Sequence, residues 1–243
     1  IFGINFNLYY LILLRKIKSV LKSEELWTYI GIVTAASAVI TVNIYNTSEK
    51  FSTFSSSLRH AAFQVSTIIT TTGYATDDFN LWPGISKMIL LILMFIGGCA
   101  GSTAGGFKLS RVILIFKQIK ANLKHLLHPR SSESIRFEGK NVDAATVYGV
   151  LSYLAIYVFC FMIILIILSF DIFGIETNLS AAIACFNNVG PGFDAVGPAA
   201  SYAGYSYVSK VTLSIAMLLG RLEIYPLLLL FSPYTWTKSR SKG

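Results

Sequence analysis

The chain has 243 residues, of which 54% are hydrophobic and 13% charged, and its mean hydropathy is +0.62. This composition is too apolar for a soluble domain of this length and indicates an integral membrane protein. The net charge of +8 also suits a nucleic-acid-binding protein. The cations lie beside apolar stretches and not on a polar face, however, so we expect no nucleic acid as a partner.

Several stretches are apolar and long enough to cross a bilayer, which takes about 20 helical residues. The predicted spans lie at about 27–45, 85–119, 144–170 and 207–236. Two further apolar runs, about Ala61 to Ile69 and Leu179 to Phe186, are only half as long. Such segments are tolerated at membrane depth where protein or a water-filled cavity surrounds their ends, so we expect two re-entrant helices.

The two halves of the chain repeat the same order of span, re-entrant helix with loop, and span. Ser86-Lys87 in the first half matches Ser209-Lys210 in the second, and Gly97 then matches Gly220. The predicted fold class is therefore an all-α integral membrane protein built from two such repeats. The expected divisions are a cytoplasmic lead-in at 1–26 that could include the end of a preceding span, a first pore repeat at 27–125, a cytoplasmic connection at 126–143, a second pore repeat at 144–236 and a cytoplasmic tail at 237–243.

Basic residues cluster before the first span, between the repeats and at the end of the chain, whereas most acidic residues fall on the other side. By the positive-inside rule, both termini and the central connection lie in the cytoplasm, and the loops around Gly73 and Gly190 open outward. The chain begins with Ile1 and not Met, which suggests a fragment or a chain whose front end is absent.

Each short apolar run ends in a polar pair and a glycine. An extended Thr-Thr-Gly stretch offers stacked carbonyl oxygens, which can replace the water around a monovalent cation, and glycine tolerates backbone conformations closed to other residues. The candidate ion ligands are Thr71, Thr72 and Gly73 in the first repeat and Asn188, Val189 and Gly190 in the second. For one copy alone, a glycine turn that caps a buried helix is the alternative.

Acidic residues follow both loops, and the C-terminal ends of the two half-helices would point toward a bound cation with their negative dipole ends. Asp77, Asp78 and Asp194 would attract cations to an outer mouth. The alternative is that these acids are solvated loop charges.

Half of the residues from Gly97 to Gly106 are glycine, which predicts a break in the second span. An unwound segment below the ion-binding loops would form a movable constriction, or gate. Its candidate residues are Gly97, Gly98, Gly101, Ser102, Thr103, Gly105 and Gly106. The alternative is a helix-packing stripe, because Gly97, Gly101 and Gly105 recur at four-residue spacing.

Arg221 lies deep in the last span and aligns with Gly98 of the first repeat. A lone arginine in a membrane is costly unless it finds acceptors, so we expect it to bond the carbonyls or hydroxyls of the Gly97–Gly106 stretch. A purely structural tie to another helix is the alternative.

Cys99, Cys160 and Cys185 have no metal-ligand spacing, and no catalytic constellation is present in the sequence. We therefore do not expect the protein to be an enzyme.

Four motifs in order resemble the TrkH family, the membrane subunit of the bacterial Trk potassium uptake system, within a superfamily that includes the Ktr and HKT transporters. The motifs are Thr71 to Tyr74, Met94 to Lys108, Asn187 to Gly192 and Gly220 to Ile224. The resemblance implies a fold of four repeats around one selectivity filter, of which this chain is repeats three and four. It also implies that the potassium ligands are Thr71, Thr72, Asn188 and Val189, and that Arg221 latches the gating loop.

The resemblance further implies potassium as the transported ion, a multi-pass location in the bacterial inner membrane and no organic cofactor. The implied partners are membrane lipid, the N-terminal half with repeats one and two, a second copy in a homodimer and a cytoplasmic nucleotide-binding subunit of the TrkA type. We therefore expect potassium translocation through a gated filter. The alternatives are an ion-coupled potassium or sodium secondary transporter, a non-conducting fragment without repeats one and two, and a membrane scaffold or intramembrane enzyme.

Overall fold

The computed structural model describes residues 2–47, 53–128 and 134–230, and within these ranges the chain is mainly helical. The elements of the first half are α1 (Phe6–Leu13), α2 (Ile17–Leu21), α3 (Glu24–Thr47), α4 (Phe54–Ile69), the 3-10 turn η1 (Phe79–Leu81), α5 (Gly84–Ile96) and α6 (Leu109–Leu127). A small antiparallel hairpin follows, made of β1 (Arg136–Phe137) and β2 (Lys140–Asn141). The second half contains α7 (Ala144–Leu168), α8 (Ile175–Phe186), η2 (Asp194–Val196), η3 (Tyr202–Gly204), α9 (Tyr207–Leu222) and α10 (Ile224–Leu230).

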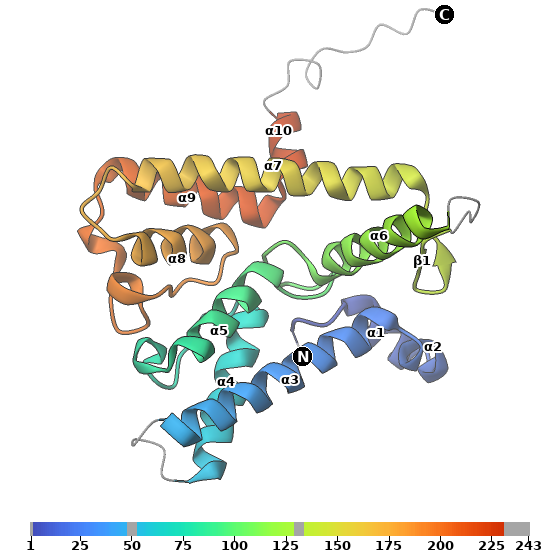
Figure 1. Ribbon diagram of the computed structural model, residues 1–243, viewed down its shortest axis with the longest axis horizontal. Coiled ribbons are helices and arrows are strands. Elements are labelled where there is room, and N and C mark those ends of the chain that lie inside the picture. The colour runs from blue at the N-terminus through green and yellow to red at the C-terminus, as the bar shows by residue number, and fades with distance from the viewer. Residues whose placement is uncertain (1, 48–52, 129–133, 231–243) are drawn as a thin grey trace, which may run out of the picture.

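The helices form two groups that correspond to the two halves of the chain. Helices α3, α4 and α5 contact one another, as do α7, α8 and α9, and Figure 1 shows the second group above the first. Contacts of α5 with α8 and of α6 with α7 join the groups. In each group one of the two predicted half-helices, α4 or α8, contacts both of the other helices.

Two of the predicted spans are single helices in the structure. Helices α3 and α7 are long and apolar enough to cross a membrane. Much of the apolar surface of α7 is uncovered, and Phe159, for example, is 67% exposed. An apolar helix with so little cover is suited to contact lipid or another protein segment.

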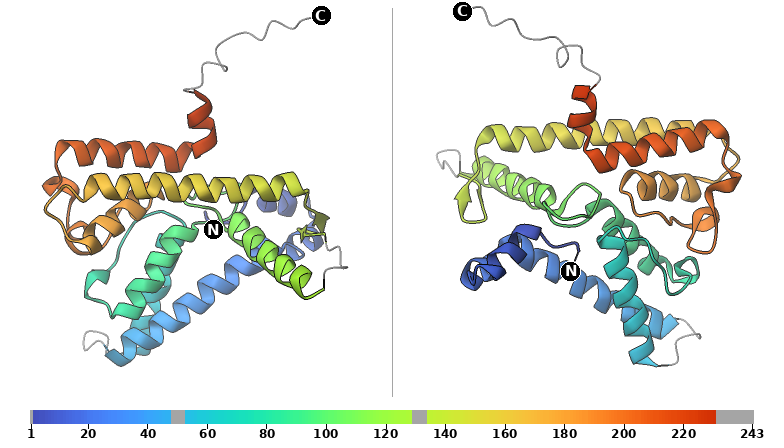
Figure 2. Two further views of the ribbon diagram at one scale, coloured as in Figure 1. Left: turned by 45° about the horizontal axis from the view of Figure 1, so that its top comes forward. Right: turned by 180° about the vertical axis from the view of Figure 1, so that it is seen from behind.

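The other two predicted spans are broken. The expected break between α5 and α6 is present, and the two helices do not form one straight rod (Figure 2). The stretch expected at 207–236 is also not one helix, because α9 ends at Leu222 and Glu223 has a positive φ of 62°. A non-glycine residue in that conformation interrupts helical hydrogen bonding. Residues 231–236 and the expected tail at 237–243 lie outside the described ranges.

The two half-helices end where the sequence predicts, at Ile69 and Phe186, but each begins earlier, at Phe54 and Ile175. The additional turns carry polar residues, which an apolar run alone does not identify. Helix α8 is buried along most of its length, including its polar residues Asn178 and Ser180. This burial by surrounding protein is the condition under which a short helix end is tolerated at membrane depth.

An aromatic cluster fixes the two groups relative to each other. The ring of Tyr157 on α7 stacks on Phe186 of α8 at 4.5 Å and meets Phe95 of α5 edge-on at 5.3 Å. Phe107, which precedes α6, stacks on Phe95 at 5.6 Å. Such pairs add to the stabilisation from apolar burial, so they hold both ends of the α5–α6 break against the second group.

Candidate functional site

The turns that follow α4 and α8 have the same backbone geometry. Thr71 and Asn188 both have positive φ values, of 51° and 58°, and Gly73 and Gly190 follow with 81° and 106°. A positive φ is uncommon for residues other than glycine, and it is least favourable for a β-branched residue such as threonine. The repetition of this pattern indicates that both turns are shaped by the same structural requirement.

The hydrogen bonds of the two turns also correspond. The amides of Thr72 and Gly73 both donate to the Thr67 carbonyl, at 2.9 and 3.4 Å. In the second turn, the amides of Val189 and Gly190 both donate to the Ala184 carbonyl, at 2.8 and 3.5 Å. Each turn thus uses its own amides to close the C-terminal end of its helix.

The carbonyl oxygens of the two turns are left free by this arrangement. Among the residues that the structure describes, no donor bonds the carbonyl oxygens of Thr71, Thr72, Asn188 or Val189. Val189 is buried, Thr71 and Asn188 are partly exposed and Thr72 is exposed, so these oxygens can accept from water or from an external ligand. A cation is one ligand that backbone carbonyl oxygens can bind.

The two turns approach each other closely. A Cβ atom at Gly73 would overlap the carbonyl oxygen of Val189 and lie 3.2 Å from Cδ of Pro191. Only glycine allows this approach, and the positive φ at Gly73 adds to the requirement. Gly190 has open space around it, so its positive φ alone explains the glycine there.

The glycine-rich segment 97–106 forms a compact loop beside both turns. The Gly105 amide donates to the Thr71 hydroxyl at 2.8 Å, and a Cβ at Gly105 would overlap the carbonyl oxygen of Asn187. Gly97, Gly101 and Gly106 have φ values near +70 to +83°. The alternative of a helix-packing stripe is therefore wrong, because these glycines are not on a helix.

The remaining gate candidates close this loop on itself. The Ser102 hydroxyl donates to the Cys99 carbonyl at 2.6 Å, and a Cβ at Gly98 would overlap that of Ala104. The loop also contacts the lead-in, because Cys99 donates from its amide to the Gly3 carbonyl at 2.8 Å. The lead-in is therefore part of the site and not a separate segment.

Arg221 reaches the loop from α9. Its Nη1 donates to the Thr103 carbonyl at 2.6 Å, which is the kind of contact that the sequence predicts. Lys108, at the start of α6, donates to the neighbouring Ala104 carbonyl. Two cations therefore bond adjacent carbonyls of one loop, and charge-assisted bonds of this kind are about twice as strong as neutral ones.

Two carboxylates near the loop are not predicted from the sequence. Glu223 pairs with Arg111 of α6 at 2.8 Å, and the Arg111 guanidinium lies 4.0 Å from the Tyr153 ring centroid. Glu25, in the first turn of α3, accepts a hydrogen bond from the Ala100 amide at 2.8 Å. No local signal identifies these pairs, because their members are far apart in the sequence.

The acids expected at an outer mouth are engaged in local structure. Asp77 accepts from Trp82 Nε1 at 3.0 Å and Asp78 accepts from the Asn80 amide at 3.0 Å. Asp194 accepts from the Thr177 hydroxyl, and its backbone amide donates to the Asn80 side chain at 2.9 Å. These acids hold the loops that follow the turns, so they are not simply solvated charges.

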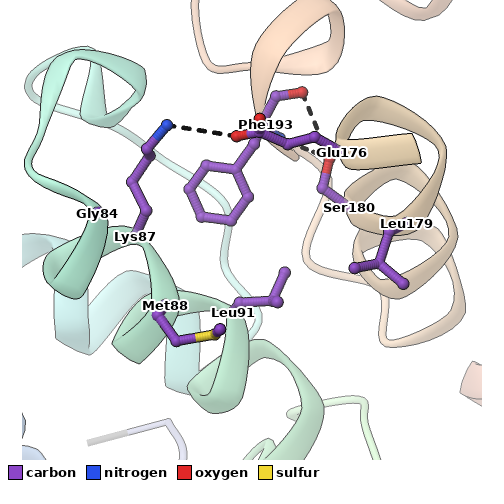
Figure 3. Close-up of a pocket in the computed structure, with 8 residues that line it drawn as sticks. All are labelled: Gly84, Lys87, Met88, Leu91, Glu176, Leu179, Ser180 and Phe193. Atoms are coloured by element: carbon purple, nitrogen blue, oxygen red, sulfur yellow. Dashed lines mark hydrogen bonds and ion pairs between the residues drawn. The ribbon is translucent and has the colours of Figure 1, made fainter. Parts of the chain in front are cut away.

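A mainly apolar cavity of about 290 Å³ lies between α5 and α8 (Figure 3). Lys87 and Glu176 form an ion pair of 3.3 Å at its edge, and Phe193 forms part of its wall. The Phe193 amide donates to Ser180 Oγ at 2.9 Å, which fixes the chain after the second turn. The unpaired carbonyls do not line this cavity.

The described residues contain no group of three His, Cys, Asp or Glu side chains placed to hold a metal ion. Cys99, Cys160 and Cys185 are free thiols, and the first and last of these are buried. In the part of the chain that the structure describes, the candidate ion ligands are the backbone carbonyls of the two turns.

Comparisons with known proteins show the family of this chain. The family model "TrkH: Cation transport protein" matches residues 8–238. The Escherichia coli K12 protein "Trk system potassium uptake protein TrkG" is 34% identical over 96% of this chain and 47% of its own length. The TrkH protein of Halomonas elongata is 38% identical over 74% of this chain and 37% of its own length.

A solved structure is similar across the same region. The crystal structure of the potassium transporter TrkH from Vibrio parahaemolyticus matches with a TM-score of 0.85 and 31% identity, over 97% of this chain and 50% of that one. The chain spans about half the length of the relatives that it matches. On the family match and these identities, the chain belongs to the TrkH family of cation transport proteins.

Proposed function

We propose that the protein conducts potassium ions across the bacterial inner membrane and that this chain supplies two of the four loops of its selectivity filter. The observation that carries the proposal is the pair of matched turns with unpaired carbonyl oxygens at Thr71, Thr72, Asn188 and Val189. Relatives named as potassium uptake proteins support potassium as the ion. The family consists of transport proteins and not of enzymes.

In this proposal the carbonyl oxygens replace the hydration shell of a potassium ion as it enters the filter. Helices α4 and α8 both end at the turns, and the C-terminal end of a helix carries a partial negative charge of roughly half a unit. These ends favour a cation near the turns. Gly73 and Gly190 allow the backbone to hold its carbonyls toward the ion path.

Two loops form only half of a filter and surround an ion on part of its circumference. The remaining two would come from the N-terminal half of the subunit, in keeping with the half-length match to the relatives. We further propose the homodimer, the cytoplasmic nucleotide-binding partner of the TrkA type and the cytoplasmic position of both ends that the sequence resemblance implies. The exposed apolar surface of α7 favours a lipid environment.

The loop 97–106 is the proposed gate. It lies against both turns, and the cations of Arg221 and Lys108 bond two of its adjacent carbonyls. In the closed state these bonds would hold the loop across the ion path. Release of the loop would open the path, because a segment without helical hydrogen bonds can move without unfolding a helix.

The test uses the complete protein expressed from its own gene. Crystals soaked in rubidium or thallium should give anomalous density within contact distance of the four named carbonyl oxygens. Proteoliposomes should take up labelled rubidium, and unlabelled potassium should compete with it. Density elsewhere in the protein and none between the turns would overturn the assignment of the filter.

A further inference from the structure

Glu25 connects the first turn of α3 to the glycine loop. Its carboxylate Oε1 accepts a hydrogen bond from the Ala100 amide at 2.8 Å, and the residue is only 5% exposed. The same carboxylate lies close to the amide of Ser110 in the first turn of α6. A negative group there is favoured by the positive end of the helix dipole, so Glu25 contacts the loop and the helix that follows it.

Charged side chains of opposite sign contact different backbone groups of the loop. Its carbonyls at Thr103 and Ala104 are bonded by cations, whereas its amide at Ala100 is bonded by an anion. A partly buried amide that loses its acceptor keeps the cost of its desolvation, so the bond to Glu25 holds this part of the loop in place. Release of the loop from the cations alone would leave it attached at Ala100.

The position of Glu25 is itself fixed from the cytoplasmic connection. Glu138, at the tip of the β1–β2 hairpin, accepts through Oε1 from the Glu25 amide and from the Ser23 hydroxyl, both at 2.9 Å. Lys117 of α6 pairs with Glu24 at 2.6 Å and also donates to the Arg136 carbonyl of the hairpin. The hairpin is therefore attached to the start of the helix that carries Glu25.

We propose that Glu25 is a positioning residue for the gate: its carboxylate holds the Ala100 side of the loop, and Glu138 of the hairpin holds Glu25. The proposal rests on the proposed function, since it assigns a role within that gate. It gives the connection between the repeats a direct route to the loop, through one hydrogen bond at each step. Movement of the hairpin would shift Glu25 and thereby loosen the loop.

The first measurement is rubidium flux into proteoliposomes that contain the complete protein and no cytoplasmic partner. Glu25→Ala should raise basal flux roughly tenfold, the scale of one lost charge-assisted hydrogen bond. Glu25→Gln keeps an acceptor for the Ala100 amide and should stay within about threefold of wild type. Glu176→Ala is the matched control, because Glu176 is also a paired carboxylate, with Lys87 as its partner, and does not contact the loop.

The second measurement does not depend on flux. Cys99 is 1% exposed and precedes Ala100, so its reaction with an uncharged alkylating reagent reports loosening of the loop. Peptide mass spectrometry can compare it with the buried Cys185 in the same sample. Glu25→Ala should speed Cys99 labelling roughly tenfold and leave Cys185 unchanged, since the opening is local. Glu25→Gln separates loss of the acceptor from loss of the charge near the thiol.

Equal labelling of Cys99 in Glu25→Ala and wild type would overturn the proposal, as would an equal rise in Glu25→Gln and Glu25→Ala. Glu138→Ala should raise labelling in the same direction, and Glu25→Ala combined with it should add no further rise. Fully additive effects would overturn the step through the hairpin. The labelling test stands even if the wild-type protein conducts no rubidium, so its failure and that of the proposed function are distinguishable.

Discussion

Thr71 and Gly105 join the turn after α4 to the glycine loop: the Gly105 amide donates to Thr71 Oγ1 at 2.8 Å. Thr71 adopts a φ of 51°, which is unfavourable for a β-branched residue. The hydroxyl contact offers a reason for threonine at position 71 of the first turn. In the second turn, the matching residue is Asn188. The candidate filter and the candidate gate are thus in direct contact.

Replacement of Thr71 by Val should loosen this contact. Valine has nearly the same shape but no acceptor, and the unpaired Gly105 amide should cost about 1–3 kcal/mol. We expect higher basal rubidium flux in Thr71→Val, measured in proteoliposomes, and flux close to wild type in Thr71→Ser, which keeps the hydroxyl. Similar flux in both variants would show that the hydroxyl is not needed.

Gly73→Ala should abolish potassium-limited growth of a strain that depends on this protein. The new methyl group would overlap the Val189 carbonyl oxygen, and the positive φ of Gly73 adds strain. Backbone must therefore move at both turns. Gly149→Ala is the control, because it adds the same methyl group on α7, where no atom lies within 4 Å of the added Cβ. Growth of Gly73→Ala at the wild-type rate, with equal protein in the membrane, would contradict the prediction.

Gly220→Ala should destabilise the packing of α9 on α8. A Cβ there would overlap the Phe186 carbonyl, and overpacking of this kind typically costs about 1–3 kcal/mol. Gly31→Ala on α3 meets no atom within 4 Å and should be neutral or stabilising by about 0.5–1 kcal/mol through helix propensity. Thermal unfolding of the purified protein in detergent compares the two. A melting temperature for Gly220→Ala at or above that of Gly31→Ala would count against this packing.

Arg221→Ala should raise basal rubidium flux, because the Thr103 carbonyl loses its charged partner. Arg221→Lys keeps a positive charge that can reach one carbonyl, so its flux should lie between those of Arg221→Ala and wild type. Peptide-resolved labelling of Cys99 tests whether the loop has loosened in each variant. A folded Arg221→Ala protein with unchanged or lower flux would leave the arginine as a structural tie between α9 and the loop.

Local patterns in the sequence predict much of this fold. The apolar lengths of α3 and α7, the ends of the half-helices at Ile69 and Phe186, and the break after α5 all follow from hydropathy and glycine content. The early start of α4 and the end of α9 at Leu222 do not, because polar residues in buried helix turns and a positive φ at Glu223 depend on tertiary contacts. The roles of the candidate residues remain predictions that the variants above test.

The sequence by itself determines the apolar composition and the residue types of the two turns, and it predicts the membrane class and the duplicated order of segments, since these depend on composition and short-range periodicity. Only the tertiary structure decides which groups meet at the loop. Glu25 on α3 accepts from an amide of the loop, and Arg221 on α9 donates to one of its carbonyls. Nearly the whole chain separates these two residues in the sequence. A hydrogen bond requires atoms about 3 Å apart, and that distance depends on how the helices pack and not on their separation in sequence.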